Sequence, residues 1–250
     1  WAYFETFAGP EDNWLAPDNY QTDPEAKIAH RSSPTNVGMQ FLSSMTALDL
    51  GHIGLRDLAQ RTEYALEALE RIERHQGHLV NWFDTRTLLS LEPRYVSTVD
   101  SGNLAVALLT LREGLVEAVN GPTLSRALWD GFIDTLGVLT EAAGDLPTEH
   151  SQVIGARIRV LSERAEAARD DPAGWRRALC QCLEEDLPKL SEAILKALDA
   201  TPGADPGELH FWFERIRHHA ASFLRDLDTL CPWLAIDGWM EFEEHAGEVA

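Results

Sequence analysis

The sequence predicts an all-α fold, and three observations carry the prediction. Apolar residues recur at steps of three and four over several long segments, which is the spacing of one face of an α-helix. Strand signals are almost absent, and the best of them is the short run RYVSTV at residues 94–99. Residues that favour helix ends stand at the borders of the periodic segments, so the chain divides into successive helices.

Two helices are expected within the first 75 residues. Ser33 suits the N-cap and Pro34 the first position of a helix that Gly51 ends. A second helix is expected over about residues 54–75, because its mostly apolar residues share one face. These residues are Leu55, Leu58, Ala59, Thr62, Leu66, Leu69 and Ile72.

A third helix is expected to be capped by Asp100 and to end near Gly121. The stretch that precedes it, residues 77–103, is longer than the ~2 to 8 residues that usually join antiparallel helices. The stretch Glu5–Gln21 is rich in Pro, Asp and Asn, so its backbone is expected to be irregular. Long loops inside a compact domain are more often functional than idle, and binding chemistry is therefore expected in this part of the chain.

The second half of the chain predicts an antiparallel helical bundle with a charged exterior. Its expected helices cover residues 124–139, 154–168 and 209–230. A further helix begins at Pro172 and is expected to kink near Pro188, because a proline ring removes a donor and clashes with the preceding turn. A turn-rich linker, residues 199–208, leads into the last helix.

The change in loop character divides the chain into three expected parts. Residues 1–120 combine helices with long polar loops, and residues 121–235 form the bundle. Residues 236–250 are expected to begin a further segment that is truncated here. Because the chain starts at Trp1 rather than Met, we expect an excerpt of something longer.

Composition excludes several classes of partner and cofactor. With 41 acidic and 21 basic residues the formal charge is -20, so nucleic acid and anionic membrane surfaces would be repelled. No apolar run approaches the ~20 residues that span a bilayer, so we expect a soluble segment without direct membrane insertion. Three cysteines favour a reduced, intracellular setting. No cofactor or metal is expected, since His210, Glu214 and His218 lie opposite an apolar stripe, as on a solvated face.

The candidate ligand-binding residues combine carboxylates, amides and aromatic rings, which suit a sugar with hydroxyls around two weakly apolar faces. Arg86 is close enough in sequence to pair with Asp84 and orient it, with Trp82 as a stacking platform. The alternatives are a structural ion pair over a buried tryptophan and, for the first loop, ordinary turn chemistry. The candidates are Asp12, Asn13, Trp14, Asp18, Trp82, Asp84, Arg86, Asp100 and Asn103.

Four sequence blocks resemble one known family. They read ETFAGPEDNWLAPDNYQ from Glu5, AHRSSPTNVG from Ala29, NWFDTRTLLSLEPRYVSTVDSGNLA from Asn81 and RIRHHAASFLRDLDTLCPWL from Arg215. Together they resemble the glycoamylase-like (cyclisation) region of bacterial cyclic β-1,2-glucan synthases, and only the N-terminal part of that region. Phe83 departs from the family pattern, where a tyrosine is expected.

This resemblance implies a partial (α/α)6 barrel, made of its first helices and long pocket loops, followed by the helical insertion. The family region is similar to a retaining glycosidase that transglycosylates and closes linear β-1,2-glucan into rings. It belongs to a large bacterial inner-membrane protein, which places this segment on the cytoplasmic face. The family's catalytic carboxylates are expected C-terminal of Ala250, so no residue of this chain is expected to be catalytic, and the excerpt alone is expected to be inactive.

The implied partners are β-1,2-linked glucan and the remaining domains of the parent chain. Two alternatives stay open at this point. The chain could be a non-catalytic helical scaffold or interaction domain of a larger membrane enzyme, which would expose apolar patches. It could also belong to a hydrolase that cleaves β-1,2-glucan without closing rings.

Overall fold

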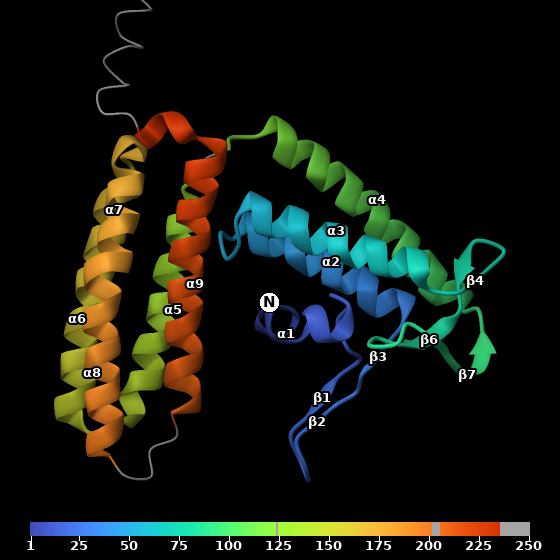
Figure 1. Ribbon diagram of the computed structural model, residues 1–250, viewed down its shortest axis with the longest axis horizontal. Coiled ribbons are helices and arrows are strands. Elements are labelled where there is room, and N and C mark those ends of the chain that lie inside the picture. The colour runs from blue at the N-terminus through green and yellow to red at the C-terminus, as the bar shows by residue number, and fades with distance from the viewer. Residues whose placement is uncertain (124, 202–205, 236–250) are drawn as a thin grey trace, which may run out of the picture. The chain divides into compact units, whose positions relative to one another are not determined.

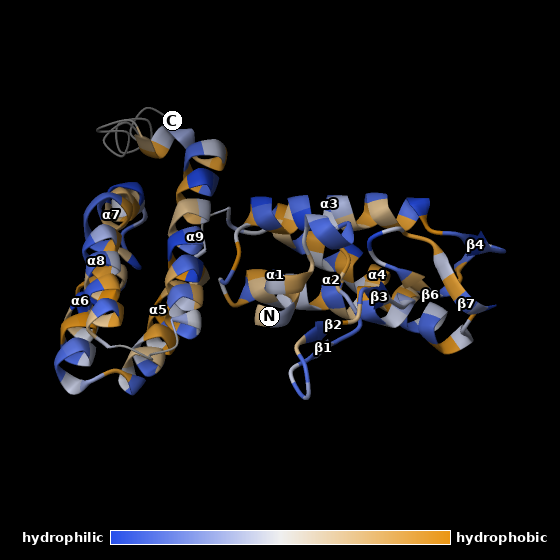
Figure 2. Ribbon diagram, turned by 60° about the horizontal axis from the view of Figure 1, so that its bottom comes forward, coloured by the Kyte–Doolittle hydropathy of each residue, from blue (hydrophilic) through white to orange (hydrophobic). Residues whose placement is uncertain are grey.

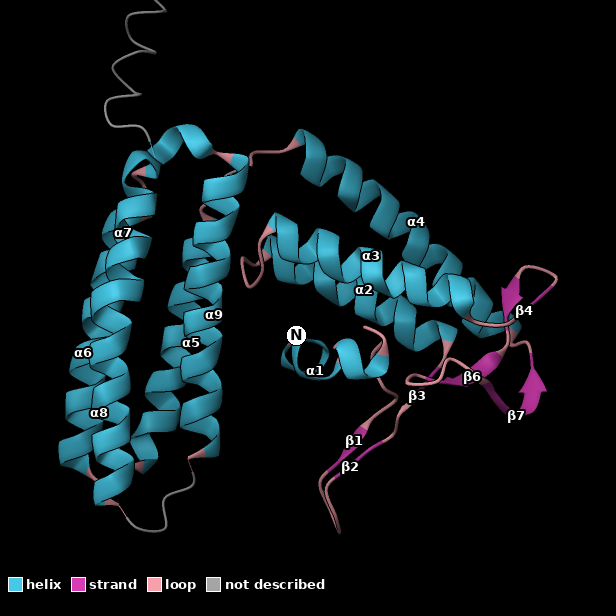
Figure 3. Ribbon diagram, viewed as in Figure 1, coloured by secondary structure: helices cyan, strands magenta, loops and turns pink. Residues whose placement is uncertain are grey.

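The computed structural model describes residues 1–123, 125–201 and 206–235. These residues are mostly helical, which confirms the all-α prediction (Figure 3). Leu124, part of the expected linker and the expected segment 236–250 lie outside the described residues. The chain forms two compact units. The first consists of Trp1–Asp49 and Leu55–Pro122, and the second of Leu50–Gly54 and Thr123–Ala250.

Three long helices form the frame of the first unit (Figure 1). They are α2 (Pro34–Asp49), α3 (Leu55–Arg71) and α4 (Thr98–Asn120). The predicted start of α2 is confirmed, because the Asn36 amide donates to Ser33 Oγ at 3.3 Å. The short helix α1 (Ala2–Phe7) precedes them, so the backbone from Glu5 is partly regular where an irregular stretch was expected.

Helices α2 and α4 run parallel and touch closely. A Cβ on Gly38 would lie 3.0 Å from the Ala107 Cβ, and one on Gly114 would collide with Met45 further along both helices. Small residues therefore let the two backbones approach. Around this contact lies the core of the unit, which contains Leu15, Val37, Phe41, Ala65, Ala68, Leu69, Ile72, Leu79, Phe83, Leu88 and Leu111.

Short strands occupy the loops of the first unit, where almost none were expected. A three-stranded antiparallel sheet has the order β3 (Arg31–Ser32), β6 (Asn81–Asp84), β7 (Ser90–Tyr95). Two hairpins pair β1 (Tyr20–Gln21) with β2 (Lys27–Ile28) and β4 (Arg74–His75) with β5 (His78–Leu79). Strands this short show no period of two in the sequence. The strand expected at residues 94–99 is displaced, since β7 ends at Tyr95 and α4 begins at Thr98.

The cap of α4 also differs from the expectation. Ser97 is the N-cap, with an extended backbone and a hydroxyl that accepts from the Asp100 amide at 3.1 Å. Asp100 is thus the third residue of the helix, and its assignment as the cap was wrong. The Ser-x-x-acid spacing from Ser97 to Asp100 is that of a capping box shifted by three residues from the predicted one.

The second unit is a bundle of helices. They are α5 (Ala127–Ala142), α6 (Thr148–Ala168), α7 (Trp175–Gln181), α8 (Leu187–Ala200) and α9 (Gly207–Leu230). Apolar and polar residues alternate in stripes along α9 (Figure 2). Trp129 and Trp175 both meet Phe223 edge to face in the core, with ring centroids 5.3 and 5.4 Å apart. The irregularity predicted before Pro188 is a π-helical turn, Cys182–Asp186.

No helix in the described ranges is both long and apolar enough to cross a membrane.

Candidate functional site

Polar side chains from the first loop and from the start of α4 meet at the first turn of α2. Asn36 donates from Nδ2 to Asp18 Oδ1 of the first loop at 3.1 Å. Its neighbour Thr35 donates from Oγ1 to Asp100 Oδ1 at 2.6 Å and accepts from Asn103 Nδ2 at 3.0 Å. The start of α2 therefore joins predicted site residues from the early and the late part of the sequence of the first unit.

Asp12 belongs to a separate set of hydrogen bonds and faces away from solvent. It ends a 3-10 turn, Pro10–Asp12, and is only 4% exposed. Its carboxylate lies 2.9 Å from His30 Nδ1 and accepts a short hydrogen bond from Thr85 Oγ1. A carboxylate held in this way supports the loop and has little surface left for a ligand.

Asn13 ties the first loop to the turn between β6 and β7. Its Nδ2 donates to the carbonyls of Thr85 at 2.8 Å and Arg86 at 2.9 Å. Asn13 and Trp14 both adopt left-handed backbone conformations, with φ of 51° and 62°. Such conformations cost about 1 kcal/mol or more outside glycine, so the surrounding hydrogen bonds must hold them.

Trp14 is half-buried and packs within the first unit. Its ring lies 5.1 Å from that of Tyr64, and its carbonyl accepts from Gln40 Nε2 at 2.7 Å. Gln40 also accepts from the Ala16 amide at 2.8 Å, so one buried side chain fixes both ends of this short segment.

Asp18 is joined to Arg31, and Arg31 covers Trp82. Asp18 Oδ2 accepts from Arg31 Nε at 3.3 Å and Nη2 at 3.1 Å, and from Asn19 Nδ2 at 3.0 Å. The Arg31 Cζ lies 4.8 Å from the centroid of the Trp82 ring. Trp82 has a φ of 57° at an irregularity in the β6–β7 pairing, between the buried residues Asn81 and Phe83.

Asp84 is bonded within its own turn. Its Oδ1 accepts from the Arg86 amide at 3.0 Å, the Thr87 amide at 2.8 Å and the Thr87 hydroxyl at 3.1 Å. Burial raises the pKa of Asp84, but these hydrogen bonds outweigh it and the pKa falls below its usual value. The expected ion pair between Asp84 and the Arg86 guanidinium is absent from the described residues, because backbone amides occupy the carboxylate instead; Arg86 contributes only its more distant charge.

Tyr3 is partly buried near the carboxylates of the first loop. Burial, together with the charges of Asp18 and Asp12, raises the pKa of Tyr3 to about 12. The Tyr3 hydroxyl donates to the Pro17 carbonyl at 2.8 Å, which the neutral phenol can do at any physiological pH.

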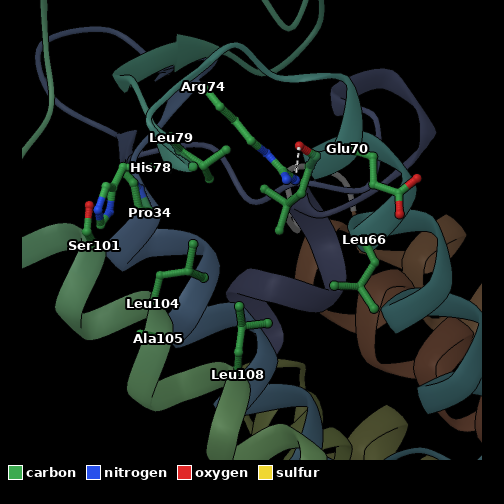
Figure 4. A pocket seen from close by; sticks show the side chains of 12 residues that line it. Pro34, Leu66, Glu70, Arg74, His78, Leu79, Ser101, Leu104, Ala105 and Leu108 are labelled. Carbon is green, nitrogen blue, oxygen red and sulfur yellow. Dashed lines mark hydrogen bonds between the residues drawn. The ribbon is translucent and has the colours of Figure 1, made fainter.

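A separate pocket of about 400 Å³ lies between α3, the β4–β5 hairpin and α4 (Figure 4). Ser101 and His78 lie at one end and Leu66 and Leu108 at the other. Its lining is largely aliphatic, and the hydroxyl of Ser101 is buried without a partner among the described residues. None of the predicted site residues lines it.

Sequence reasoning missed several residues that bond to the predicted ones, namely His30, Arg31, Thr35, Asn36 and Thr85. All but the last fall in the block AHRSSPTNVG, just before and within the first turn of α2. A run of polar residues that leads into a helix start was the available signal. The described residues contain no group of three or more His, Cys, Asp or Glu side chains placed to hold a metal ion.

No family model matches the chain. The curated protein cyclic β-(1,2)-glucan synthase NdvB of Rhizobium meliloti (strain 1021) is 39% identical over 186 residues. The match covers 74% of this chain and only 6% of that relative, so the chain spans a small part of the relative's length. The chain is therefore homologous to a segment of the bacterial cyclic β-(1,2)-glucan synthases.

Proposed function

We propose that this chain is a fragment of a cyclic β-(1,2)-glucan synthase and supplies loops that bind the glucan. The supporting observation is the convergence of Asp18, Asp100 and Asn103 on the first turn of α2. Asp18 lies in the first loop, whereas Asp100 and Asn103 lie in the first two turns of α4, so the start of α2 joins segments that are distant in sequence. Their half-buried and exposed polar atoms form a rim suited to a neutral ligand with many hydroxyls.

The predicted residues then divide into two roles. Asp12, Asn13 and Trp14 hold the first loop in place, since their polar groups bond to the protein. Asn103 and Arg86 are exposed and contribute directly to the rim. In this reading the carboxylates of the first loop orient other groups and break no glycosidic bond.

We further propose that the first unit is part of an (α/α)6 barrel. Parallel α2 and α4 with α3 between them in sequence, and long loops at one end, suit the repeating helix pairs of such a barrel. The apolar residues on the outside of α4 support this proposal. Val99 is 70% exposed, Val106 64% and Leu109 62%, so further helices would cover them in the barrel.

Catalysis is assigned to the parent protein. A retaining mechanism needs two carboxylates about 5 to 5.5 Å apart, and we place that pair C-terminal of Ala250. We also place this segment on the cytoplasmic face of the inner membrane, together with the other domains of the parent chain. The isolated fragment should then bind glucan without transglycosylating it.

Isothermal titration calorimetry tests the proposal. The 250-residue chain is titrated with β-1,2-linked glucooligosaccharides and, as a control, with β-1,4-linked ones of the same length. Tighter binding of the β-1,2 series is expected. Equal affinity for the two series, or no binding of either, would instead favour a scaffold role. The specific observation in favour of that role is the exposed apolar side of α4.

A further inference from the structure

We propose that Arg31 is the principal glucan-contacting residue of this rim, and that Asp18 and Trp82 act only by positioning it. The inference rests on the function proposed above and deepens it. It also changes the role of two residues that sequence patterns favour as ligand contacts.

Exposure separates Arg31 from its partner. The side chain of Arg31 is 51% exposed, whereas that of Asp18 is 18% exposed. Both oxygens of Asp18 already accept hydrogen bonds, Oδ1 from Asn36 and Oδ2 from Arg31 and Asn19. Asp18 thus has little capacity left for a sugar hydroxyl, and its charge is already compensated.

Arg31 keeps free donors in a fixed plane. A guanidinium has five N–H groups, and Arg31 directs only Nε and Nη2 toward Asp18. Among the described residues the Nη1 side of Arg31 has no acceptor. Asp18 fixes one edge of the group and the Trp82 ring lies under its face at 4.8 Å, so the free edge is held in one orientation.

The strained backbone of Trp82 fits this role. A tryptophan with a φ of 57° persists only where its surroundings hold it, and such outliers concentrate at functional sites. The irregularity at β6 brings the ring under Arg31, whose register partner across the sheet is Asp84. Trp82 therefore presents one face of its ring to Arg31 and supports the guanidinium.

The chemistry selects a neutral ligand with adjacent hydroxyls. Two parallel N–H groups on one edge match two neighbouring oxygen acceptors. The Asp18 carboxylate already pairs with the charge of Arg31, so the guanidinium needs no second anion. Adjacent hydroxyls on a glucose ring supply the acceptors without the charge.

Calorimetry and fluorescence with β-1,2-linked glucooligosaccharides test the assignment. Arg31→Met should weaken binding about tenfold or more, as expected for loss of hydrogen bonds from a charged group. Arg31→Lys should recover little, because it keeps the charge and loses the planar edge. The matched control is Arg61→Met, since Arg61 also stacks on a tryptophan of the same unit, Trp1, at 5.3 Å. It should leave the dissociation constant within twofold of wild type.

A double-mutant cycle separates contact from positioning. Asp18→Asn should weaken binding about threefold in the wild-type background and should have no further effect in the Arg31→Met background, because it acts through Arg31. A ligand-induced change in fluorescence should be lost in both Arg31→Met and Trp82→Phe and kept in the Arg61→Met control.

The outcomes distinguish the two levels of the proposal. If wild type binds the glucan and Arg31→Met binds equally well, the assignment of Arg31 fails while the proposed function stands. Additive effects of the Asp18 and Arg31 substitutions would make Asp18 a contact in its own right. If wild type shows no β-1,2 binding, the proposed function falls and the assignment with it. A lower melting temperature with unchanged affinity would reduce Arg31 to a structural residue.

Discussion

Replacing Asp12 by alanine removes the centre of the buried network under the first loop. The carboxylate accepts from Thr85 Oγ1 and His30 Nδ1, and hydrogen bonds to charged groups contribute about 1.5 to 3 kcal/mol each. His30 is 23% exposed in its side chain, so water can partly satisfy it after the change. We therefore expect the free energy of unfolding to fall by about 3 kcal/mol, which is the sum of the two bonds at the low end of that range. For a unit of this size that corresponds to a fall of roughly 10 °C in melting temperature.

Hydrogen exchange measures this change locally, which matters because two units need not unfold together. The Thr85 amide donates to the His30 carbonyl at 3.1 Å and reports directly on the network. Its protection factor should fall about 100-fold in Asp12→Ala, since 1.4 kcal/mol corresponds to a factor of ten. The matched control is Glu11→Ala, an exposed carboxylate one residue earlier, which should change protection less than threefold. Equal effects of the two substitutions would refute the structural role assigned to Asp12.

Three further predictions concern other parts of the chain. In urea denaturation, Leu111→Ala should lower the free energy of unfolding of the first unit by about 3 kcal/mol, and Leu109→Ala by less than about 0.5 kcal/mol, since only Leu111 is buried. Similar losses for the two variants would show that the outside of α4 is already covered. Burial raises the pKa of the Cys182 thiol to about 12. At pH 8 Cys182 should therefore resist iodoacetamide in the native protein, while the half-buried Cys180 reacts. Equal rates of modification would contradict the burial of Cys182. The folded pKa of Asp84 is depressed, so its stabilising effect is present above its unfolded pKa of about 4 and is lost as pH falls through the folded value. The difference in unfolding free energy between wild type and Asp84→Asn should therefore shrink below pH 4. A difference that is independent of pH would contradict the hydrogen bonds of this turn.

Helix positions were predictable because their signal is long and periodic. The start of α2 was identified from Ser33 and Pro34 alone, since a cap residue and a proline at the first turn act locally. The cap of α4 was misplaced by three residues because Ser97 and Asp100 both suit an N-cap, and only the backbone conformation of Ser97 decides between them.

The inner arrangement of the site was not predictable in the same way. Nothing local distinguishes the buried Asp12 from the exposed Glu11, because burial depends on His30 and Thr85, which arrive from other loops. The contact of Arg31 with Trp82 depends on the register of a two-residue strand against β6, and such a strand has no periodic signature.

We propose above that the loops around the start of α2 bind β-1,2-linked glucan. Nuclear magnetic resonance with selectively labelled side chains tests it most directly, by following Asn36, Asn103 and the Trp82 indole during titration with a β-1,2-linked glucooligosaccharide. We expect these signals to shift together and saturate, while Trp129 and Trp175 in the second unit stay unchanged. Shifts confined to the second unit, or none at all with the ligand in large excess, would contradict it.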